Sequence, residues 1–212
     1  MLSFSNQAGA VIVSDLIKTI QENKVYLSDI DGAIGDGDHG INMNKGFSIC
    51  KDRLSPDQNL SEAFNMLGDV LLTEIGGSMG PIYGTFFIEM SEKIKGVDEI
   101  DINKFGEMIS AGLAGIRELV PTEVGDKTLL DTLIPAVNAF KEAIADGKDF
   151  IKALDMAADA AEKGKDSTED MIAKVGRASR LGERSRGVLD AGATSCWLIL
   201  NSMFMTVKEL LK

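Results

Sequence analysis

Apolar residues recur at helical spacing along most of the chain, and this periodicity limits the folds that the chain can adopt. The pattern is most regular at Phe105, Ile109, Leu113 and Ile116. Similar stripes occur in Ser3–Gln21 and in segments that start at Phe64, Phe86, Leu130, Ile151 and Trp197. Spacing of this kind places apolar side chains along one face of an α-helix. The sequence has no run of alternating β-branched residues between tight turns, so strands are not expected.

Turn-forming residues separate these stripes, for example at Gly35–Gly40, Gly76–Gly77, Pro121–Gly125 and Gly182–Gly192. Counting each stripe between breaks as one element gives about eight helices. Short connections favour antiparallel neighbours, so we predict an all-α fold in which about eight antiparallel, up-and-down helices form a barrel or bundle. A length of 212 residues suits one domain, and we assign residues 1–212 to it.

The net charge of −11 opposes binding to nucleic acid or to an anionic membrane, because their phosphates would be repelled. It is compatible with a phosphorylated ligand, since Mg²⁺ can bridge carboxylates to phosphates. Cys50 and Cys196 are the only cysteines and lack a zinc-ligand spacing, which is typical of free thiols in a reducing compartment. The sequence shows neither a signal peptide nor an apolar stretch of about 18 residues, so we expect a cytoplasmic protein.

Three carboxylates and four glycines are concentrated in Asp31–Gly40, which reads DGAIGDGDHG. Carboxylates crowded in one loop repel each other unless a cation offsets the repulsion. A hard divalent cation does so, and aspartate oxygens are its preferred ligands. The glycines let the backbone turn sharply around such an ion. Asp31, Asp36 and Asp38 are therefore candidate ligands of a divalent metal ion.

Two other interpretations apply to this acidic segment. An EF-hand calcium loop is excluded, because a loop that starts at Asp29 or Asp36 has no glutamate at its twelfth position. A solvated, glycine-rich turn in which Asp38 caps the next helix remains an alternative. The single histidine, His39, follows the acids directly and is either a structural residue or part of the site.

Two further segments are candidates for phosphate contact. Glu74–Thr85 contains four glycines around a predicted helix start, where backbone N–H groups can face an anion. The alternative for this segment is a helix end followed by a restart. Gly176–Ala193 carries four arginines in an otherwise acidic protein, and arginine suits bidentate contact with phosphate. The alternative for the arginines is ion pairing with neighbouring acids such as Glu183.

A third segment, Gly125–Asp131, resembles part of a P-loop. It is not one, because Asp126 occupies the place of the glycine that a P-loop has before its lysine. The sequence also lacks the signature motifs of protein kinases. Lys127 is therefore a weak candidate for phosphate binding, and taken alone it is expected to be a solvated surface lysine.

The four segments, taken in this order, resemble the nucleotide-binding (L) subunit family of dihydroxyacetone kinase. The family patterns are D-x-x-x-G-D-x-D-H-G, G-G-x-x-G-P-x-x-G-T, G-D-K-T-x-x-D and G-R-A-x-x-x-G-E-R-S-x-G-x-x-D-x-G-A. All four occur here between Asp31 and Ala193. The sequence departs from the family where Met79 replaces a small residue and Ala191 replaces a proline, and neither position is a candidate metal ligand.

The resemblance implies a barrel of antiparallel helices with ADP or ATP on loops at one end. It implies that two Mg²⁺ ions are held by Asp31, Asp36 and Asp38. It also implies a set of nucleotide contacts at the start of the following helix, in the second glycine segment, beside the base and in the arginine segment: His39, Gly40, Ile41, Asn42, Ser78, Met79, Leu129, Arg177, Asp190 and Gly192.

The activity implied by the resemblance is phosphoryl transfer from the nucleotide to dihydroxyacetone. In this family the ketose is held covalently on a histidine of a partner K subunit, and the only histidine of this chain lies in the metal motif. We therefore expect activity only with a K subunit, and recharging of bound ADP by an M subunit of the phosphotransferase system. Exchange of free ATP is the alternative. Other possibilities are a nucleotide-sensing module that binds a transcription regulator and a kinase subunit for another ketose, such as a tetrulose.

Overall fold

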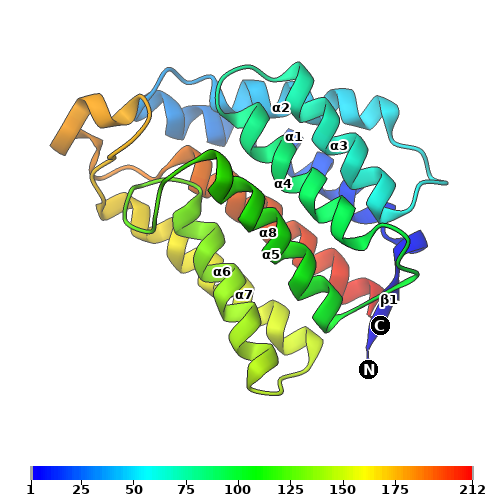
Figure 1. The fold of residues 1–212 in the computed structure, drawn as a ribbon. Coiled ribbons are helices and arrows are strands. Elements are labelled where there is room, and N and C mark those ends of the chain that lie inside the picture. The colour runs from blue at the N-terminus through cyan, green and yellow to red at the C-terminus, as the bar shows by residue number, and fades with distance from the viewer. Residues whose placement is uncertain (1, 212) are drawn as a thin grey trace.

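The computed structural model describes residues 2–211 and is built almost entirely from α-helices (Figure 1). Within these residues eight α-helices follow one another: α1 (Ala10–Ile34), α2 (His39–Arg53), α3 (Leu60–Glu74), α4 (Met79–Ile94), α5 (Ile102–Leu119), α6 (Leu130–Ala145), α7 (Phe150–Ser167) and α8 (Ala191–Leu210). Short 3₁₀ helices cover Asn6–Ala8, Thr168–Asp170 and Ala178–Ser185. The all-α prediction and the expected number of helices are confirmed.

The helices form a closed ring, in which each packs against the next in sequence and α8 returns to α1. Neighbouring helices run antiparallel, so even-numbered helices begin at one end of the barrel and odd-numbered helices at the other (Figure 1). We call these the site end and the far end. Residues 171–189, which we call the arginine loop, join α7 to α8 at the site end and are drawn in orange in Figure 1.

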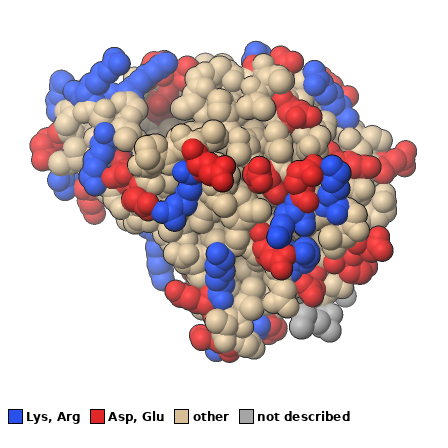
Figure 2. All heavy atoms as spheres, in the orientation of Figure 1, with Lys and Arg blue, Asp and Glu red and all other residues tan. Residues whose placement is uncertain are grey.

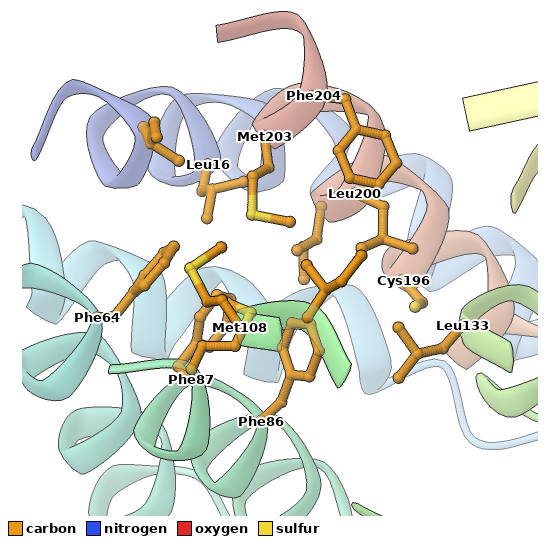
Figure 3. Packing of buried hydrophobic residues seen from close by; sticks show 14 of the residues in the cluster. Leu16, Phe64, Phe86, Phe87, Met108, Leu133, Cys196, Leu200, Met203 and Phe204 are labelled. Atoms are coloured by element: carbon orange, nitrogen blue, oxygen red, sulfur yellow. The ribbon is translucent and has the colours of Figure 1, made fainter. Parts of the chain in front are cut away.

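One hydrophobic core runs through the barrel (Figure 3). Every helix contributes to it at least one large buried side chain, among them Leu16, Phe47, Phe64, Phe87, Phe105, Phe140, Phe150 and Phe204. Phe64 on α3 and Phe87 on α4 are in contact, with ring centroids 5.5 Å apart. Burial of apolar surface on this scale is the main favourable contribution to folding. A single core shared by all the helices is what the single-domain expectation requires.

The helices that begin at the far end after α1 are capped by their own N-cap side chains. Asn59 accepts a hydrogen bond from the backbone of Glu62, and the Glu62 side chain accepts one from the Asn59 backbone, which forms a capping box. Asp101 caps α5 and Asp149 caps α7, and each carboxylate accepts one hydrogen bond from the backbone three residues on. Such side chains satisfy backbone N–H groups that have no partner within the helix.

A cluster of four phenylalanines fills the barrel toward the far end. Phe105 lies 5.3 Å from Phe140, 5.5 Å from Phe150 and 6.2 Å from Phe204, measured between ring centroids. The tilted and edge-on arrangements are those that the charge distribution of aromatic rings favours. These rings come from α5, α6, α7 and α8, so the cluster packs four of the eight helices against one another.

Two short strands, β1 (Ser3–Ser5) and β2 (Glu99–Asp101), pair antiparallel at the far end. The expectation of a chain without strands, with a helical pattern from Ser3 onward, is corrected here, since α1 begins at Ala10. The paired residues Phe4 and Ile100 are both buried, which explains why the segment extends instead of coiling. Within residues 2–211 each helix is too short or too polar to span a lipid bilayer.

Candidate functional site

The three aspartates predicted as metal ligands come together at the site end. One carboxylate oxygen from each of Asp31, Asp36 and Asp38 lies within 4.8 Å of the others. Asp31 was predicted to lie in a loop, but it lies in the last turn of α1, because α1 continues to Ile34. Three carboxylates at this spacing repel each other, and a hard divalent cation with oxygen ligands at 2.0–2.6 Å offsets the repulsion. The donor set therefore fits Mg²⁺.

A tight turn between α1 and α2 creates this cluster. The Gly35 N–H donates to the Asp31 carbonyl at 2.5 Å and ends α1, and Gly37 has a φ of 76°, which favours glycine. The His39 N–H donates to the Asp31 carboxylate at 3.3 Å. Asp38 precedes α2, but in the described chain its side chain makes no capping hydrogen bond. The alternative in which Asp38 serves as a helix cap is therefore not supported.

Four helices point their N-termini at the same end of the barrel as these acids. The up-and-down topology places the first residues of α2, α4, α6 and α8 there. In the described residues the N-cap side chains of α2, α4 and α6 make no hydrogen bond to their helices, whereas Asp190 caps α8 by accepting from Ala193 at 2.7 Å. Helix N-termini carry partial positive charge and available N–H groups. Convergent N-termini beside a candidate metal-binding cluster suit an anionic, phosphate-bearing ligand.

A pocket of about 770 Å³ lies between the acids and these helix starts. Its volume is within the range that holds small-molecule ligands and cofactors. Of the predicted site residues, it is lined by Asp31, Asp36, Asp38, His39, Asn42, Ser78, Met79, Leu129, Arg177, Asp190 and Gly192. The structure thus brings together residues that are up to 161 positions apart in sequence, from Asp31 to Gly192.

Two predicted residues lie outside the lining of the pocket. Gly40 faces α1, where a side chain at this position would collide with the Lys24 carbonyl. The side chain of Ile41 is 64% exposed on the surface of α2. Gly40 therefore brings α1 and α2 into close contact, and any contact of these two residues with a ligand would be made by their backbone N–H groups at the start of α2.

His39 is a buried, neutral residue of this site. Burial lowers the pKa of His39 to about 4, and the nearby Asp31 carboxylate opposes this effect only in part. Its Nε2 lies 2.8 Å from the Ser195 hydroxyl, which in turn lies 2.6 Å from the Tyr83 hydroxyl. A neutral imidazole adds no positive charge next to the metal cluster. The side chain instead joins α2 to α8 and α4 by hydrogen bonds.

Tyr83, which lines the pocket, and Ser195, which bonds to it and to His39, were not predicted from the sequence. The Tyr83 hydroxyl donates to the carbonyl of Gly192 at 3.2 Å, and Tyr83 itself lines the pocket. Burial raises the pKa of Tyr83 well above its usual value, so the phenol stays protonated. Tyr83 lies inside the second glycine segment, but no spacing rule connects it with a serine 112 positions away.

Arg177 in the arginine loop and Asp190, which directly follows the loop, both line the pocket. The Arg177 guanidinium pairs with the Asp36 carboxylate, although both side chains remain partly exposed. Arg186 pairs with Glu183 at 3.3 Å, so the expected alternative of local ion pairing holds for this arginine. Burial raises the pKa of Asp190 to about 6, and the hydrogen bond from Ala193 opposes that shift. Figure 2 shows Lys and Arg side chains gathered over the region that Figure 1 draws in orange.

Lys127 differs from its expected place. Taken alone it was predicted to be a solvated surface lysine, but the residue is only 2% exposed and its ammonium group donates to backbone carbonyls. Asp131, in the same segment, accepts from Gly125 at 2.5 Å and from Thr128 at 2.7 Å. The segment therefore forms a folded turn in front of α6. Its buried lysine could not be recognised from sequence, because its partners lie more than 40 positions away.

Comparison with known proteins gives matches along most of the chain. The sequence model described as the DAK2 domain matches residues 33–205. The chain is 39% identical over 196 residues to "PEP-dependent dihydroxyacetone kinase 1, ADP-binding subunit DhaL" of Listeria innocua, a match that covers 92% of this chain and 93% of the relative. It is 35% identical over 197 residues to the ADP-binding subunit DhaL of the PEP-dependent dihydroxyacetone kinase of Escherichia coli, with 92% of each chain covered.

A solved structure supports the fold. The native crystal structure of the dihydroxyacetone kinase of C. freundii matches with a TM-score of 0.70 at 25% identity, over 97% of this chain and 36% of that chain. A second structure of that enzyme, in complex with AMP-PNP and Mg²⁺, matches with a TM-score of 0.68 at 24% identity, over 93% of this chain and 33% of that chain. Because the family model matches residues 33–205, which are most of the chain, the chain belongs to the DAK2-domain family.

Proposed function

We propose that this chain is the nucleotide-binding subunit of a dihydroxyacetone-type kinase and holds ADP or ATP in the site-end pocket. One observation carries the proposal: the carboxylates of Asp31, Asp36 and Asp38 share one pocket with four helix N-termini. Carboxylates suit Mg²⁺, helix N-termini suit phosphates, and the ion links the two. The names of the curated relatives, which are ADP-binding subunits, support the same assignment.

Different residues of the pocket would bind the metal ions, the phosphates and the base. Asp31, Asp36 and Asp38 would hold Mg²⁺, for which we propose two ions, and bound Mg²⁺ would neutralise phosphate charge during transfer. Backbone N–H groups at the start of α2 and α4 would contact the phosphates, with Arg177 at the mouth of the pocket. The apolar side chains of Leu129 and Met79 would cover the base. Phosphoryl transfer needs mainly positioning and charge neutralisation, which such a site supplies.

We propose that the acceptor and the phosphoryl donor are brought by other proteins. The only histidine of the chain, His39, is buried and hydrogen-bonded, so it is poorly suited to carry a ketose covalently. A K-type subunit would carry dihydroxyacetone, and an M-type subunit of the phosphotransferase system would recharge bound ADP. The PEP-dependence named for the curated relatives supports this donor. A cytoplasmic location and a single domain over residues 1–212 complete the proposal, and the shared core supports the latter.

The first test is the content of the purified protein. The chain is denatured, the released small molecules are separated by anion exchange, and magnesium is measured in parallel. Stoichiometric ADP with Mg²⁺ is the expected result and favours ADP as a resident coenzyme. Uptake of added Mg-ATP by an empty protein would indicate a freely exchanging kinase. A protein that is empty and binds neither Mg-ADP nor Mg-ATP would contradict the nucleotide site.

The second test is complementation. The chain is mixed with a K-type subunit and dihydroxyacetone, and a phosphorylated M-type subunit or free ATP is supplied as donor. Product formation only in the presence of both the chain and the K-type subunit is expected. A chain that binds nucleotide but restores no kinase activity would instead fit the sensing module that binds a transcription regulator. A rate for the chain alone equal to that of the mixture would refute the need for a partner.

A further inference from the structure

Lys127 has a left-handed backbone conformation, which residues other than glycine rarely adopt. Among residues 2–211 it is the one non-glycine residue with a positive φ, at 63°. Its side chain is buried, with 2% of its surface exposed. A left-handed backbone and a desolvated ammonium group each cost free energy, and burial lowers the pKa of Lys127 below its usual range. Such a combination persists only where surrounding contacts compensate for it, and it is found most often at functional sites.

The compensating contacts all come from the arginine loop. The Lys127 ammonium group donates to the carbonyl of Met171 at 3.3 Å, of Ser185 at 2.6 Å and of Val188 at 2.6 Å. These bonds use all three donors of the group. Met171 begins the loop, and Ser185 and Val188 lie near its end. One side chain therefore joins both ends of the loop to the turn in front of α6.

The loop is also closed on itself close to this lysine. The Ser185 hydroxyl accepts from the Ala173 N–H at 2.9 Å and donates to the Gly182 carbonyl at 2.7 Å. Lys174 forms a second link to the same turn, through an ion pair with Asp126 at 2.9 Å. The Lys174 side chain is 62% exposed, so this pair contributes little. Two backbone hydrogen bonds add to these links, from the Lys174 N–H to the Asp126 carbonyl at 3.2 Å and from the Gly187 N–H to the Glu169 carbonyl at 2.7 Å. Lys127 differs from them because one buried side chain bonds both ends of the loop.

The arginine loop forms part of the wall of the pocket. Its residues 175–178 line the pocket, and Arg177 pairs there with Asp36. With all three donors occupied, Lys127 has none left for a phosphate. We infer that Lys127 is a positioning residue, which holds the arginine loop closed over the pocket so that Arg177 stays opposite the metal-binding carboxylates. The effect on nucleotide rests on the proposed function, whereas the effect on the loop does not.

Proteolysis at arginine tests the loop without any ligand. Four arginines lie in the loop, Arg177, Arg180, Arg184 and Arg186, and the other two of the chain, Arg53 and Arg117, serve as internal references. A protease that cleaves only after arginine keeps the same sites when the lysine is replaced. In Lys127→Met the three carbonyls lose their donor, and cleavage in the loop should become about tenfold faster, since it follows the population of the open form. Cleavage at the two reference sites should stay unchanged.

Two variants serve as controls. Lys165→Met removes another buried lysine, 8% exposed, whose ammonium group pairs with Asp166 on α7, and loop cleavage should stay as in the wild type. Lys127→Gln keeps two N–H donors on a shorter side chain and should give an intermediate rate. Unchanged loop cleavage in Lys127→Met, or equal acceleration at all six arginines, would overturn the inference. If Lys127→Met does not fold, Lys127→Gln decides by the same comparison.

Nucleotide affinity provides the second readout. Lys127→Met should weaken Mg-ADP and Mg-ATP by similar factors, because the loop opens in either case. A lysine that contacted phosphate directly would instead give a larger loss for ATP, with unchanged loop cleavage, and that result would also overturn the inference. If the wild-type chain binds neither nucleotide, the proposed function fails, but the cleavage comparison still decides whether Lys127 holds the loop.

Discussion

The two ends of the barrel are made from the same helices but differ in how most of their helix starts are capped, with α1 and α8 as the exceptions. At the far end α3, α5 and α7 are capped by Asn59, Asp101 and Asp149, and four phenylalanines fill the interior nearby. At the site end, within the described residues, α2, α4 and α6 begin without a hydrogen bond from their N-cap side chains, around a pocket of about 770 Å³. Aromatic packing and capped helices are therefore concentrated at one end, and the candidate ligand site lies at the other.

A substitution in the aromatic cluster is the strongest test of this comparison. Phe105→Ala removes a fully buried ring and should lower the free energy of unfolding by about 3–5 kcal/mol. Denaturant unfolding measures the loss, and Mg-ADP titration of the folded protein should give an unchanged dissociation constant. Phe105→Leu, which leaves a smaller cavity, should lose less stability. A weaker affinity in Phe105→Ala at full folding would show that the two ends are coupled.

Removing one carboxylate should weaken nucleotide binding and leave the stability of the fold almost unchanged. Asp36→Asn should weaken Mg-ADP by about 100-fold, the upper range found for residues that support metal ligands, which corresponds to about 2.7 kcal/mol. Without metal the free energy of unfolding should change by less than about 1 kcal/mol, because the lost pair with Arg177 is partly exposed. Isothermal titration and thermal unfolding measure the two quantities.

Asp29→Asn is the matched control, since Asp29 is an exposed aspartate on α1, two positions before Asp31. It should change neither affinity nor stability. Equal affinity of Asp36→Asn and the wild type for Mg-ADP would remove Asp36 from the metal site.

The smallest expected effects come from a pair of substitutions at helix starts. Asn59→Ala breaks the capping box of α3 and should cost about 1 kcal/mol, a shift of about 2–4 °C in melting temperature, with no change in affinity. Ser78→Ala at the start of α4 breaks no capping bond, so melting should hardly change. Ser78 lines the pocket, where we propose that its hydroxyl donates to a phosphate, so its loss should instead weaken Mg-ADP by about tenfold, as expected for one hydrogen bond to a charged group. A reversed pattern would refute the contrast between the two ends.

Much of the fold was predictable because it depends on local pattern. Apolar stripes such as the one from Phe105 to Ile116 specify an amphipathic helix wherever they occur, and the glycine segments interrupt them. The clustering of the three carboxylates was predictable for the same reason, since Asp31, Asp36 and Asp38 lie within eight positions of one another. Short separations leave few ways to keep the three carboxylates apart.

Other features depend on partners that are distant in sequence. The extension of Ser3–Ser5 into a strand requires Glu99–Asp101, and the burial of Lys127 requires carbonyls 44 to 61 positions away. The contact of Tyr83 with Ser195 spans 112 positions. Periodicity and motif spacing carry no information on such pairs, because the packing of the helices selects them.

Local sequence pattern was enough to predict the all-α class, the glycine-rich breaks between helices and the grouping of three aspartates as candidate metal ligands. Long-range packing brings four helix N-termini to these acids, buries His39 against Ser195 and places the Lys127 ammonium group on the carbonyls of the arginine loop. The physical reason is the same in each case. Side-chain type and local spacing fix what a residue can do, whereas burial and the position of distant backbone groups decide what it does.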